Sequence, residues 1–383
     1  MSVKREIVNE MIFLKDKYPI LALTGPRQSG KTTLLKELFP NYTYVSLENP
    51  DIRAFAQNDP NAFFKQYDKY CIIDEAQRVP EIFSYLQTIV DDSKIMGQYI
   101  LSGSQNFHLI KGITQSLAGR VALFKLFPFD FNELKSENLL SNDYIKAMIK
   151  GFYPAIFDRN IPPHTFYSNY LQTYVERDIT EVLNIRDLRT FRTFLSLCAS
   201  RAGQLLNLNA LANECGITQP TAKAWISVLE SSYIVFLLQP YHKNFDKRVI
   251  KSPKLYFYDT GLLCSLLKIK EENQIKFQSH KGHLFENMIV AETVKQKYHT
   301  NALNDLWFFR DAAGHEVDLI VQKDDVLELN EIKATQTISQ DLFKELSYFE
   351  NLSKEKIEVK KLIYAGNDNQ KRTGVDVLSW YNL

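Results

Sequence analysis

Cysteine is scarce in this sequence, and its few copies lie far apart. The four cysteines, Cys71, Cys198, Cys215 and Cys264, form no Cys-x-x-Cys pair. This usage predicts neither a disulfide framework nor a zinc ribbon, and it fits a reducing cytosol. The N-terminal residues MSVKREIVNEMIF have no apolar core and no small-residue cleavage site, so they do not predict a signal peptide.

Long apolar runs and a large net charge are missing as well. The most apolar stretch, Tyr233 to Leu238, is far shorter than the roughly 20 residues with which a helix spans a bilayer. We therefore expect a cytoplasmic protein without a membrane partner. Lys and Arg number 46 against 45 Asp and Glu, which gives a formal net charge of +1. Any binding of nucleic acid must therefore come from a local basic patch.

The chain does have length and apolar mass, with 383 residues, 45% hydrophobic and 13% aromatic. This globular composition predicts two or three domains. The first part alternates short apolar runs with helical periodicity, which predicts an α/β fold with a mainly parallel sheet covered on both faces. Five runs are its expected strands: Pro19–Thr24, Tyr42–Leu47, Tyr70–Asp74, Gln98–Ser102 and Val121–Phe127.

The pattern changes twice further along the chain. Residues 131–205 are mainly helical. Residues 206–238 then predict short helices around Cys215-Gly216-Ile217 and a strand, the outline of a winged helix-turn-helix. From about residue 281 a helix is followed by three strands, a helix and one more strand. These segments are Leu284–Lys297, Leu306–Arg310, Glu316–Gln322, Val326–Ile332, Gln340–Glu350 and Lys361–Ala365.

A phosphate-binding loop lies between the first expected strand and the helix after it. Residues 25–32, GPRQSGKT, match G-x-x-x-x-G-K-[ST] without a mismatch. The glycines of this motif let backbone N–H groups and the helix N-terminus point at phosphate. Lys31 is predicted to reach the β- and γ-phosphates, and the Thr32 hydroxyl to ligate Mg²⁺. The predicted nucleotide contacts are Gly25, Pro26, Arg27, Gln28, Ser29, Gly30, Lys31, Thr32 and Thr33.

Two adjacent acids, Asp74 and Glu75, end the third expected strand. We predict that Asp74 holds Mg²⁺ through water, as in a Walker B strand, and that Glu75 polarises the attacking water. Adjacent acids after a strand can instead cap a helix, which is the alternative. The sequence lacks the Asn-Lys-x-Asp pattern of guanine recognition, so ATP is the expected nucleotide.

Four further residues are candidates for contact with the γ-phosphate. Ser104, with Ser102 as second choice, follows the fourth strand, where a polar side chain would sense the phosphate. A simple Gly/Ser turn is the alternative. Arg120 is the first candidate for an arginine finger that reaches a neighbouring subunit, and Arg177 is the second. A finger implies a homo-oligomer, whereas either arginine can instead form a surface ion pair.

With these motifs in order, the chain resembles the AAA+-type prokaryotic ATPases that carry a C-terminal domain of unknown function. The shared runs are TGPRQSGKTTLL, SLEN, IIDEAQ, LSGSQ, SLAGR, YVERDI and KSPKLYFYDTGL, and they extend over nearly the whole chain. Glu48 in SLEN departs from the expected Asp. The resemblance implies an AAA+ core (1–130), a helical lid (131–205), a winged-helix domain (206–280) and a restriction-endonuclease-like domain (281–383).

Basic residues of the winged-helix segment are the predicted DNA contacts. Gln219–Leu229 would be the recognition helix. The stretch His242–Lys254 carries five basic residues against one acid, and on a wing it would contact the DNA backbone. The predicted contacts are Lys223, Lys243, Lys247, Arg248 and Lys251. A winged helix that serves only protein packing is the alternative.

An ordered set of charged residues near the C-terminus is similar to the PD-(D/E)xK nuclease pattern. Glu286 lies on an expected helix and Asp318 on a strand, and Glu331 and Lys333 share one face of the next strand. Asp318 and Glu331 are predicted to bind Mg²⁺ jointly, with Lys333 beside the attacking water. The residue before Asp318 is Val317 instead of Pro. A nuclease-like fold without cleavage is the alternative.

Together these features predict an AAA+-type ATPase that couples Mg-ATP hydrolysis to work on a macromolecule. DNA is the expected partner, and the C-terminal set is a candidate metal-dependent nuclease. The alternative is a nucleotide-dependent switch or protein-interaction ATPase whose C-terminal fold is only a scaffold.

Overall fold

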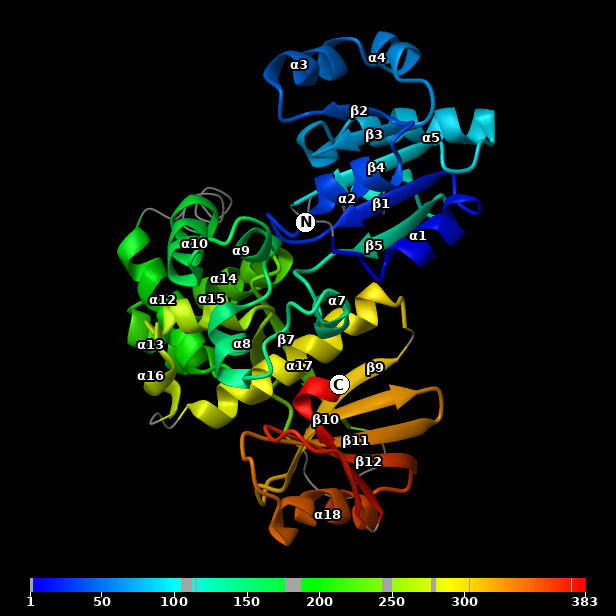
Figure 1. The fold of residues 1–383 in the computed structure, drawn as a ribbon. Coiled ribbons are helices and arrows are strands. Elements are labelled where there is room, and N and C mark those ends of the chain that lie inside the picture. Colours follow the sequence, from blue (N-terminus) through cyan, green and yellow to red (C-terminus); the bar gives the residue numbers. More distant parts are fainter. Residues whose placement is uncertain are drawn as a thin grey trace. The chain divides into compact units, whose positions relative to one another are not determined.

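The structure is a computed structural model that describes residues 3–104, 112–113, 116–175, 187–242, 250–276, 280–302, 304–372 and 374–383. The chain divides into two compact units. The first comprises residues 1–129 with 231–233 and 298–301, and the second comprises 130–230, 234–297 and 302–383. Figure 1 follows the chain through both units. In the described ranges, no helix combines the length and the apolar character that crossing a membrane requires.

The first unit is built on a five-stranded sheet in the order β2-β3-β4-β1-β5, with all neighbours parallel. The side chains of β1 (Ile20–Thr24) alternate between two cores. Ile20 and Ala22 belong to one core, and Leu21 and Leu23 belong to the other. The remaining strands are β2 (Thr43–Ser46), β3 (Cys71–Asp74), β4 (Tyr99–Gly103) and β5 (Val121–Lys125). The five predicted strands and their parallel arrangement are confirmed.

Helices cover both faces of this sheet, as predicted. The core around Leu21 and Leu23 is shared with α1 (Val8–Lys15) and α2 (Lys31–Leu38). The core around Ile20 and Ala22 is shared with α3, α4 and α5. These helices are α3 (Pro50–Asn58), α4 (Pro60–Gln66) and α5 (Ile82–Ser93), and a 3-10 turn, η1 (Ala76–Arg78), precedes α5. Because β1, β3 and β4 are parallel neighbours, their carboxyl ends lie at the same edge of the sheet. Parallel α/β folds bind ligands at this edge.

The second unit contains a nine-stranded mixed sheet in the order β13-β14-β12-β11-β10-β9-β7-β8-β6. Its strands are β6 (Gln204–Leu205), β7 (Val235–Pro240), β8 (Lys254–Phe257), β9 (Asp305–Arg310), β10 (Glu316–Lys323), β11 (Val326–Lys333), β12 (Lys356–Tyr364), β13 (Gln370–Arg372) and β14 (Val375–Ser379). Because β7 pairs with both β8 and β9, one sheet crosses the domain boundary predicted near residue 280. The four-part division of the chain stays a prediction.

Helices flank this sheet along the chain. The predicted turn lies between α13 and α14, where Gly216 ends α13 with a left-handed φ of 67°. Near the C-terminus, α18 packs Leu346 and Phe349 into the core of the sheet. The helices are α7 (Phe131–Ser136), α8 (Tyr144–Lys150), α9 (Pro154–Asp158), α10 (Pro163–Tyr170), α12 (Leu188–Ser200), α13 (Leu208–Cys215), α14 (Gln219–Ser231), α15 (Thr260–Leu266), α16 (Glu272–Lys276), α17 (Lys281–His299) and α18 (Lys344–Leu352). The second unit also contains a π-helix, η2 (Leu171–Val175), and two 3-10 helices, η3 (Gln340–Phe343) and η4 (Trp380–Asn382).

Candidate nucleotide site and C-terminal acidic cluster

The loop between β1 and α2 is tightly curved. Gly25 has a φ of +146°, and a Cβ at this position would lie 2.1 Å from the carbonyl oxygen of Leu126. Gly30, with a φ of 95°, directly precedes α2. Both positions strain any residue that carries a side chain, so the glycines are what allow the loop to curl around a ligand.

Lys31 begins α2 and is only 7% exposed. Its Nζ donates to the carbonyl oxygens of Gly25 at 2.9 Å and of Pro26 at 2.8 Å. Burial lowers the pKa of Lys31 to about 8, although the carboxylates of Glu75 and Asp74 oppose this effect. The ammonium is thus held over the loop by carbonyl groups, which phosphate oxygens can replace.

Asp74, at the end of β3, is the centre of a hydrogen-bond network. Its Oδ2 accepts from the hydroxyl of Thr32 at 3.2 Å and from that of Tyr44 at 2.6 Å. Its Oδ1 accepts from the Ser102 hydroxyl and, at 3.2 Å, from the backbone N–H of Glu75. The structure therefore brings together Thr32 and Asp74, the two residues predicted to hold Mg²⁺. Tyr44 was not predicted, since its strand carries no motif.

Glu75 has a backbone conformation that is rare for a residue other than glycine. Its φ and ψ are 54° and 43°, in the left-handed region. Such conformations cost about 1–3 kcal/mol and gather at functional sites. Its Oε2 accepts from the Ser104 hydroxyl at 3.1 Å and from the side-chain amide of Gln77. The Glu75 side chain makes no capping hydrogen bond to η1, so Glu75 does not act as the helix cap that the sequence offers as the alternative.

Arg5 braces the phosphate-binding loop from outside the motif. It is 6% exposed, and it donates to the carbonyl oxygens of Ser29 at 3.0 Å and of Phe127 at 2.6 Å. Its guanidinium also lies 4.8 Å from the centroid of the Phe129 ring. Ser29 is fully buried, and its hydroxyl has no hydrogen-bond partner among the described residues. An isolated arginine near the start of a chain carries no sequence signal, so only the fold identifies Arg5.

Arg120 forms a bidentate ion pair with Asp91 of α5. Its Nε and Nη2 lie 2.6 and 2.7 Å from the two carboxylate oxygens. This is the surface pairing that the sequence offers as the alternative to a finger, and Arg120 must leave Asp91 to reach another subunit. The second candidate, Arg177, lies outside the described residues. In the loop, Gln28 is exposed and Arg27 is partly exposed, and Thr33 is exposed on the first turn of α2.

The predicted nuclease residues converge in the second unit. Lys333 Nζ contacts Asp318 Oδ2 across the β10–β11 pair at 3.0 Å, and it also contacts Glu331 Oε1 on its own strand. Burial and the charge of Asp318 raise the pKa of Glu331 to about 9, although Lys333 opposes this shift. Carboxylate oxygens of Glu286 on α17, and of Glu316 and Asp318 on β10, lie within 4.8 Å of one another.

Lys254 lies within this cluster. The sequence predicts it at the end of an exposed basic stretch, and the structure corrects that prediction. Its side chain is 2% exposed, and its Nζ contacts Glu286 Oε1 at 2.7 Å and also Glu316 Oε1. It therefore faces buried carboxylates and is not available to a DNA backbone. Glu316 was missed as well, although its position two residues before Asp318, on the same strand face, is a usable signal.

The nuclease pattern implies a divalent ion. The acidic residues differ in how many of their carboxylate oxygens are free for such an ion: Glu286 and Glu316 form a first half of the cluster, and Glu331 belongs to the second. Magnesium needs carboxylate oxygens that are free to coordinate it. In the first half, Glu286 Oε1 already accepts from Tyr256 at 2.6 Å and from Lys254, and Glu316 Oε2 contacts Arg310 at 2.7 Å. These oxygens are already engaged by hydrogen-bond donors. In the second half, the buried Oε2 of Glu331 has no partner among the described residues.

Two of the predicted DNA contacts lie in the described part of the chain. Lys223 is exposed on α14, and Lys251 is exposed three residues before β8. The hydroxyl of Thr218 accepts from the backbone N–H of Thr221 at 3.3 Å and caps the start of α14. The other contacts, Lys243, Lys247 and Arg248, lie outside the described residues.

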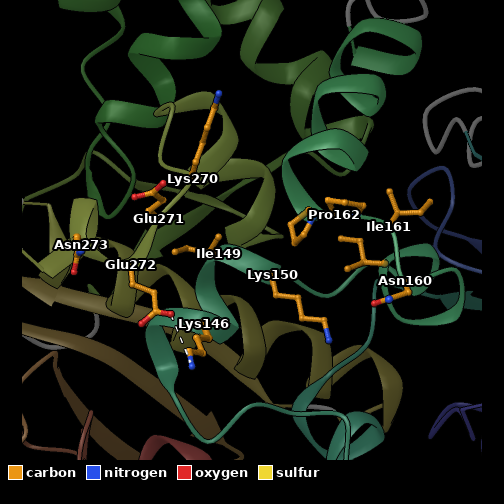
Figure 2. Close-up of a pocket in the computed structure, with 12 residues that line it drawn as sticks. Lys146, Ile149, Lys150, Asn160, Ile161, Pro162, Lys270, Glu271, Glu272 and Asn273 are labelled. Carbon is orange, nitrogen blue, oxygen red and sulfur yellow. Dashed lines mark ion pairs between the residues drawn. The ribbon is translucent and has the colours of Figure 1, made fainter.

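A surface pocket of about 800 Å³ lies in the second unit, formed by α8, α16 and the loop at residues 160–163 (Figure 2). It is lined in part by Lys146, Lys150 and Lys270. Lys146 pairs with Glu272 at 3.9 Å, as the dashed line in Figure 2 marks. The residues that line this pocket include none of those predicted for the nucleotide site or the acidic cluster.

Family models match three consecutive parts of the chain. The AAA domain matches residues 17–135, and two domains of unknown function, DUF8612 and DUF4143, match residues 141–273 and 281–383. The uncharacterized protein Rv2008c of Mycobacterium tuberculosis is 31% identical over 327 residues, which cover 84% of this chain and 71% of that protein. An uncharacterized protein of Haemophilus influenzae is 22% identical over 331 residues, which cover 78% and 80%.

Two solved structures are similar at lower sequence identity. The Walker-type ATPase PABY2304 of Pyrococcus abyssi is 13% identical with a TM-score of 0.46, over 68% of this chain and 95% of that one. DnaA from Aquifex aeolicus, bound to AMPPCP, is 17% identical with a TM-score of 0.32, over 59% and 86%.

The parallel sheet, the phosphate-binding loop and the matched AAA domain define a nucleotide-binding P-loop ATPase of the AAA type. The chain belongs to the family of these ATPases that carry a C-terminal domain of unknown function. The protein is therefore an ATPase, as its sequence predicts.

Proposed function

We propose that this ATPase couples Mg-ATP hydrolysis to action on DNA. The supporting observation is the order of elements in the second unit, where α13, a tight turn at Gly216 and α14 are followed by the β7–β8 pair. Winged-helix proteins use this order to present a helix to the major groove and a hairpin to the backbone. The exposed Lys223 on α14 and Lys251 beside β8 supply positive charge at both elements.

In the proposed reaction the loop N–H groups bind the phosphates, and Lys31 exchanges its carbonyl partners for the β- and γ-phosphates. Thr32 and Asp74 would hold Mg²⁺, which neutralises phosphate charge when it is bound. Glu75 accepts a hydrogen bond from the attacking water and polarises it. Ser104, which donates to Glu75, fixes the orientation of that carboxylate.

We propose further that the protein works as a homo-oligomer. Arg120 would release Asp91 and reach the γ-phosphate of a neighbouring subunit, where it stabilises charge in the transition state. The pair lies at the surface, where water can replace each partner.

The rate of ATP turnover with and without duplex, single-stranded and branched DNA tests the proposed partner. We expect DNA to raise the turnover of the wild type. The double variant Lys223→Glu and Lys251→Glu should lose this stimulation and keep the basal rate. The double variant Lys371→Glu and Arg372→Glu is the matched control, because it reverses two exposed charges on β13, at the other edge of the sheet. If no DNA stimulates turnover, the nucleotide-dependent switch becomes the better account.

Cleavage of DNA by the C-terminal fold is the second candidate function. The unpartnered Oε2 of Glu331 favours it, because a buried carboxylate oxygen without a donor is suited to a metal ion. Nicking of DNA supported by Mg²⁺ or Mn²⁺ should then be lost in Asp318→Ala and Lys333→Ala, and ATP turnover should remain. If the wild type cleaves no DNA with either ion, the fold serves only as a scaffold.

A further inference from the structure

A buried lysine lies where the nuclease pattern implies a metal ion. We infer that Lys254 is the resident cation of the carboxylate cluster formed by Glu286, Glu316 and Asp318, and that it keeps divalent metal ions out of this cluster. The inference does not depend on the proposed action on DNA, because it concerns the occupant of the cluster alone.

The contacts of Lys254 are those that a bound cation would make. Its Nζ lies 2.7 Å from Glu286 Oε1 and also contacts Glu316 Oε1. Oxygens of Glu286, Glu316 and Asp318 lie within 4.8 Å of one another, close enough for one cation to bridge them. The ammonium therefore neutralises two of the three carboxylates that a metal ion at this point would coordinate.

The fold holds Lys254 in this place. Its side chain is 2% exposed, and β8 is an inner strand with Lys254 opposite Leu238 of β7 and Leu205 of β6. Its ammonium also lies 5.5 Å from the centroid of the Phe308 ring. A buried ammonium that lost its carboxylates would have no compensating partner, so the pairs are strongly favoured over separation.

Other donors complete the occupation of the cluster. Tyr256 follows Lys254 by two residues on the same face of β8 and donates to Glu286 Oε1 at 2.6 Å. Arg310 contacts Glu316 Oε2 at 2.7 Å. A doubly charged ion at this point would have to displace these donors, and it would be repelled by the ammonium at close range.

One consequence is that Glu331, whose buried Oε2 has no donor among the described residues, is the predicted nuclease acid best placed for a metal ion. Glu286 then serves as an anchor, because it ties α17 to Lys254 and Tyr256 of β8. The cluster joins α17, β8 and β10 by buried ion pairs instead of by a metal ion.

The test counts Mn²⁺ ions bound by the full chain without nucleotide, by electron paramagnetic resonance and calorimetric titration. Lys254→Met keeps the bulk of the side chain and removes its charge, so this variant should bind one more ion per chain than the wild type. Lys254→Arg keeps the charge and should bind the wild-type number. Adding Glu316→Gln to Lys254→Met should remove the gained ion. Equal numbers in the wild type and Lys254→Met would overturn the inference.

A second variant covers the case in which Lys254→Met does not fold, because its buried carboxylates lose their partner. Glu316→Gln alone should bind as many Mn²⁺ ions as the wild type, with the same affinity, because Glu316 binds Lys254 and no metal. Circular dichroism checks that Glu316→Gln and the wild type are both folded. Loss of a bound ion in Glu316→Gln would show that Glu316 is a metal ligand, and the inference would fail.

Discussion

The hydroxyl of Tyr44 donates a 2.6 Å hydrogen bond to Asp74 Oδ2, the oxygen that also accepts from Thr32. The two residues lie on neighbouring parallel strands, where Asp74 is paired with Ser46. Burial and the bond to Asp74 raise the pKa of Tyr44, so the phenol remains a donor at neutral pH. Tyr44 therefore positions the carboxylate proposed to bind Mg²⁺, and its hydrogen bond competes with the metal for the same oxygen.

Tyr44→Phe should lower the Mg²⁺ concentration that gives half-maximal ATP turnover. The lost bond is worth about 1 kcal/mol, which corresponds to roughly a fivefold change. The measurement is a Mg²⁺ titration of ATPase activity at saturating ATP. Tyr42→Phe is the control, because the Tyr42 hydroxyl donates to the carbonyl of Gly97, away from Asp74. A higher Mg²⁺ requirement in Tyr44→Phe would mean that Tyr44 supports the metal site instead of competing with it.

ATP affinity should depend on the charge of Lys31. The pKa of this residue is lowered to about 8 by burial, and phosphate binding needs the ammonium. Affinity should therefore be level below that pH and fall above it, by up to about tenfold per pH unit. Anisotropy of a fluorescent ATP analogue across this range measures the effect. Lys31→Arg should bind independently of pH over the same range, and Lys31→Ala should lose binding.

Glu75→Gln should keep ATP binding and lose hydrolysis, because the amide cannot polarise the attacking water. Ser104→Ala should lower turnover by roughly fivefold, since Glu75 loses one orienting hydrogen bond of about 1 kcal/mol. Rates of single and double variants, with binding measured in parallel, separate the two roles. Ser104→Ala should have no further effect in the Glu75→Gln background. Normal turnover by Glu75→Gln would disprove the role assigned to Glu75.

Mixing two inactive variants tests the finger role of Arg120. Arg120→Ala and Glu75→Gln should each turn over ATP poorly, and a mixture should regain activity. The reason is that some mixed interfaces combine an intact Glu75 with an intact Arg120. Asp91→Ala, which removes the partner of Arg120, should stay active. Without recovery on mixing, Arg120 serves only in its surface ion pair with Asp91.

Arg5→Ala should destabilise the first unit and raise the KM for ATP more than it changes kcat. The arginine makes charged hydrogen bonds to the carbonyls of Ser29 and Phe127, and such bonds contribute about 1.5–3 kcal/mol each. Urea unfolding and steady-state kinetics measure the two effects. Arg5→Lys should recover part of the stability, because its ammonium can reach one carbonyl. An unchanged KM would show that Arg5 supports the fold without positioning the loop.

The sequence alone determined the local parts of the nucleotide site. The glycines, Lys31 and Thr32 lie within eight consecutive residues between a strand and a helix, so short-range geometry brings them together. The strands β1, β3 and β4 of the first sheet were predictable because each is an apolar run that the sheet buries. By contrast, β13 is the exposed run Gln370–Arg372 and has no apolar pattern to reveal it.

The tertiary structure decided which distant residues meet. Tyr44 and Asp74 are 30 positions apart and Arg5 and Ser29 are 24 apart, and no local pattern links either pair. Lys254 shows the limit most clearly, because its neighbours in sequence predict an exposed basic stretch. Pairing of β8 within the sheet turns the Lys254 side chain toward buried acids, which compensate the charge of its ammonium. Whether a lysine meets water or carboxylates depends on the elements that pack beside it, and only the folded chain settles that.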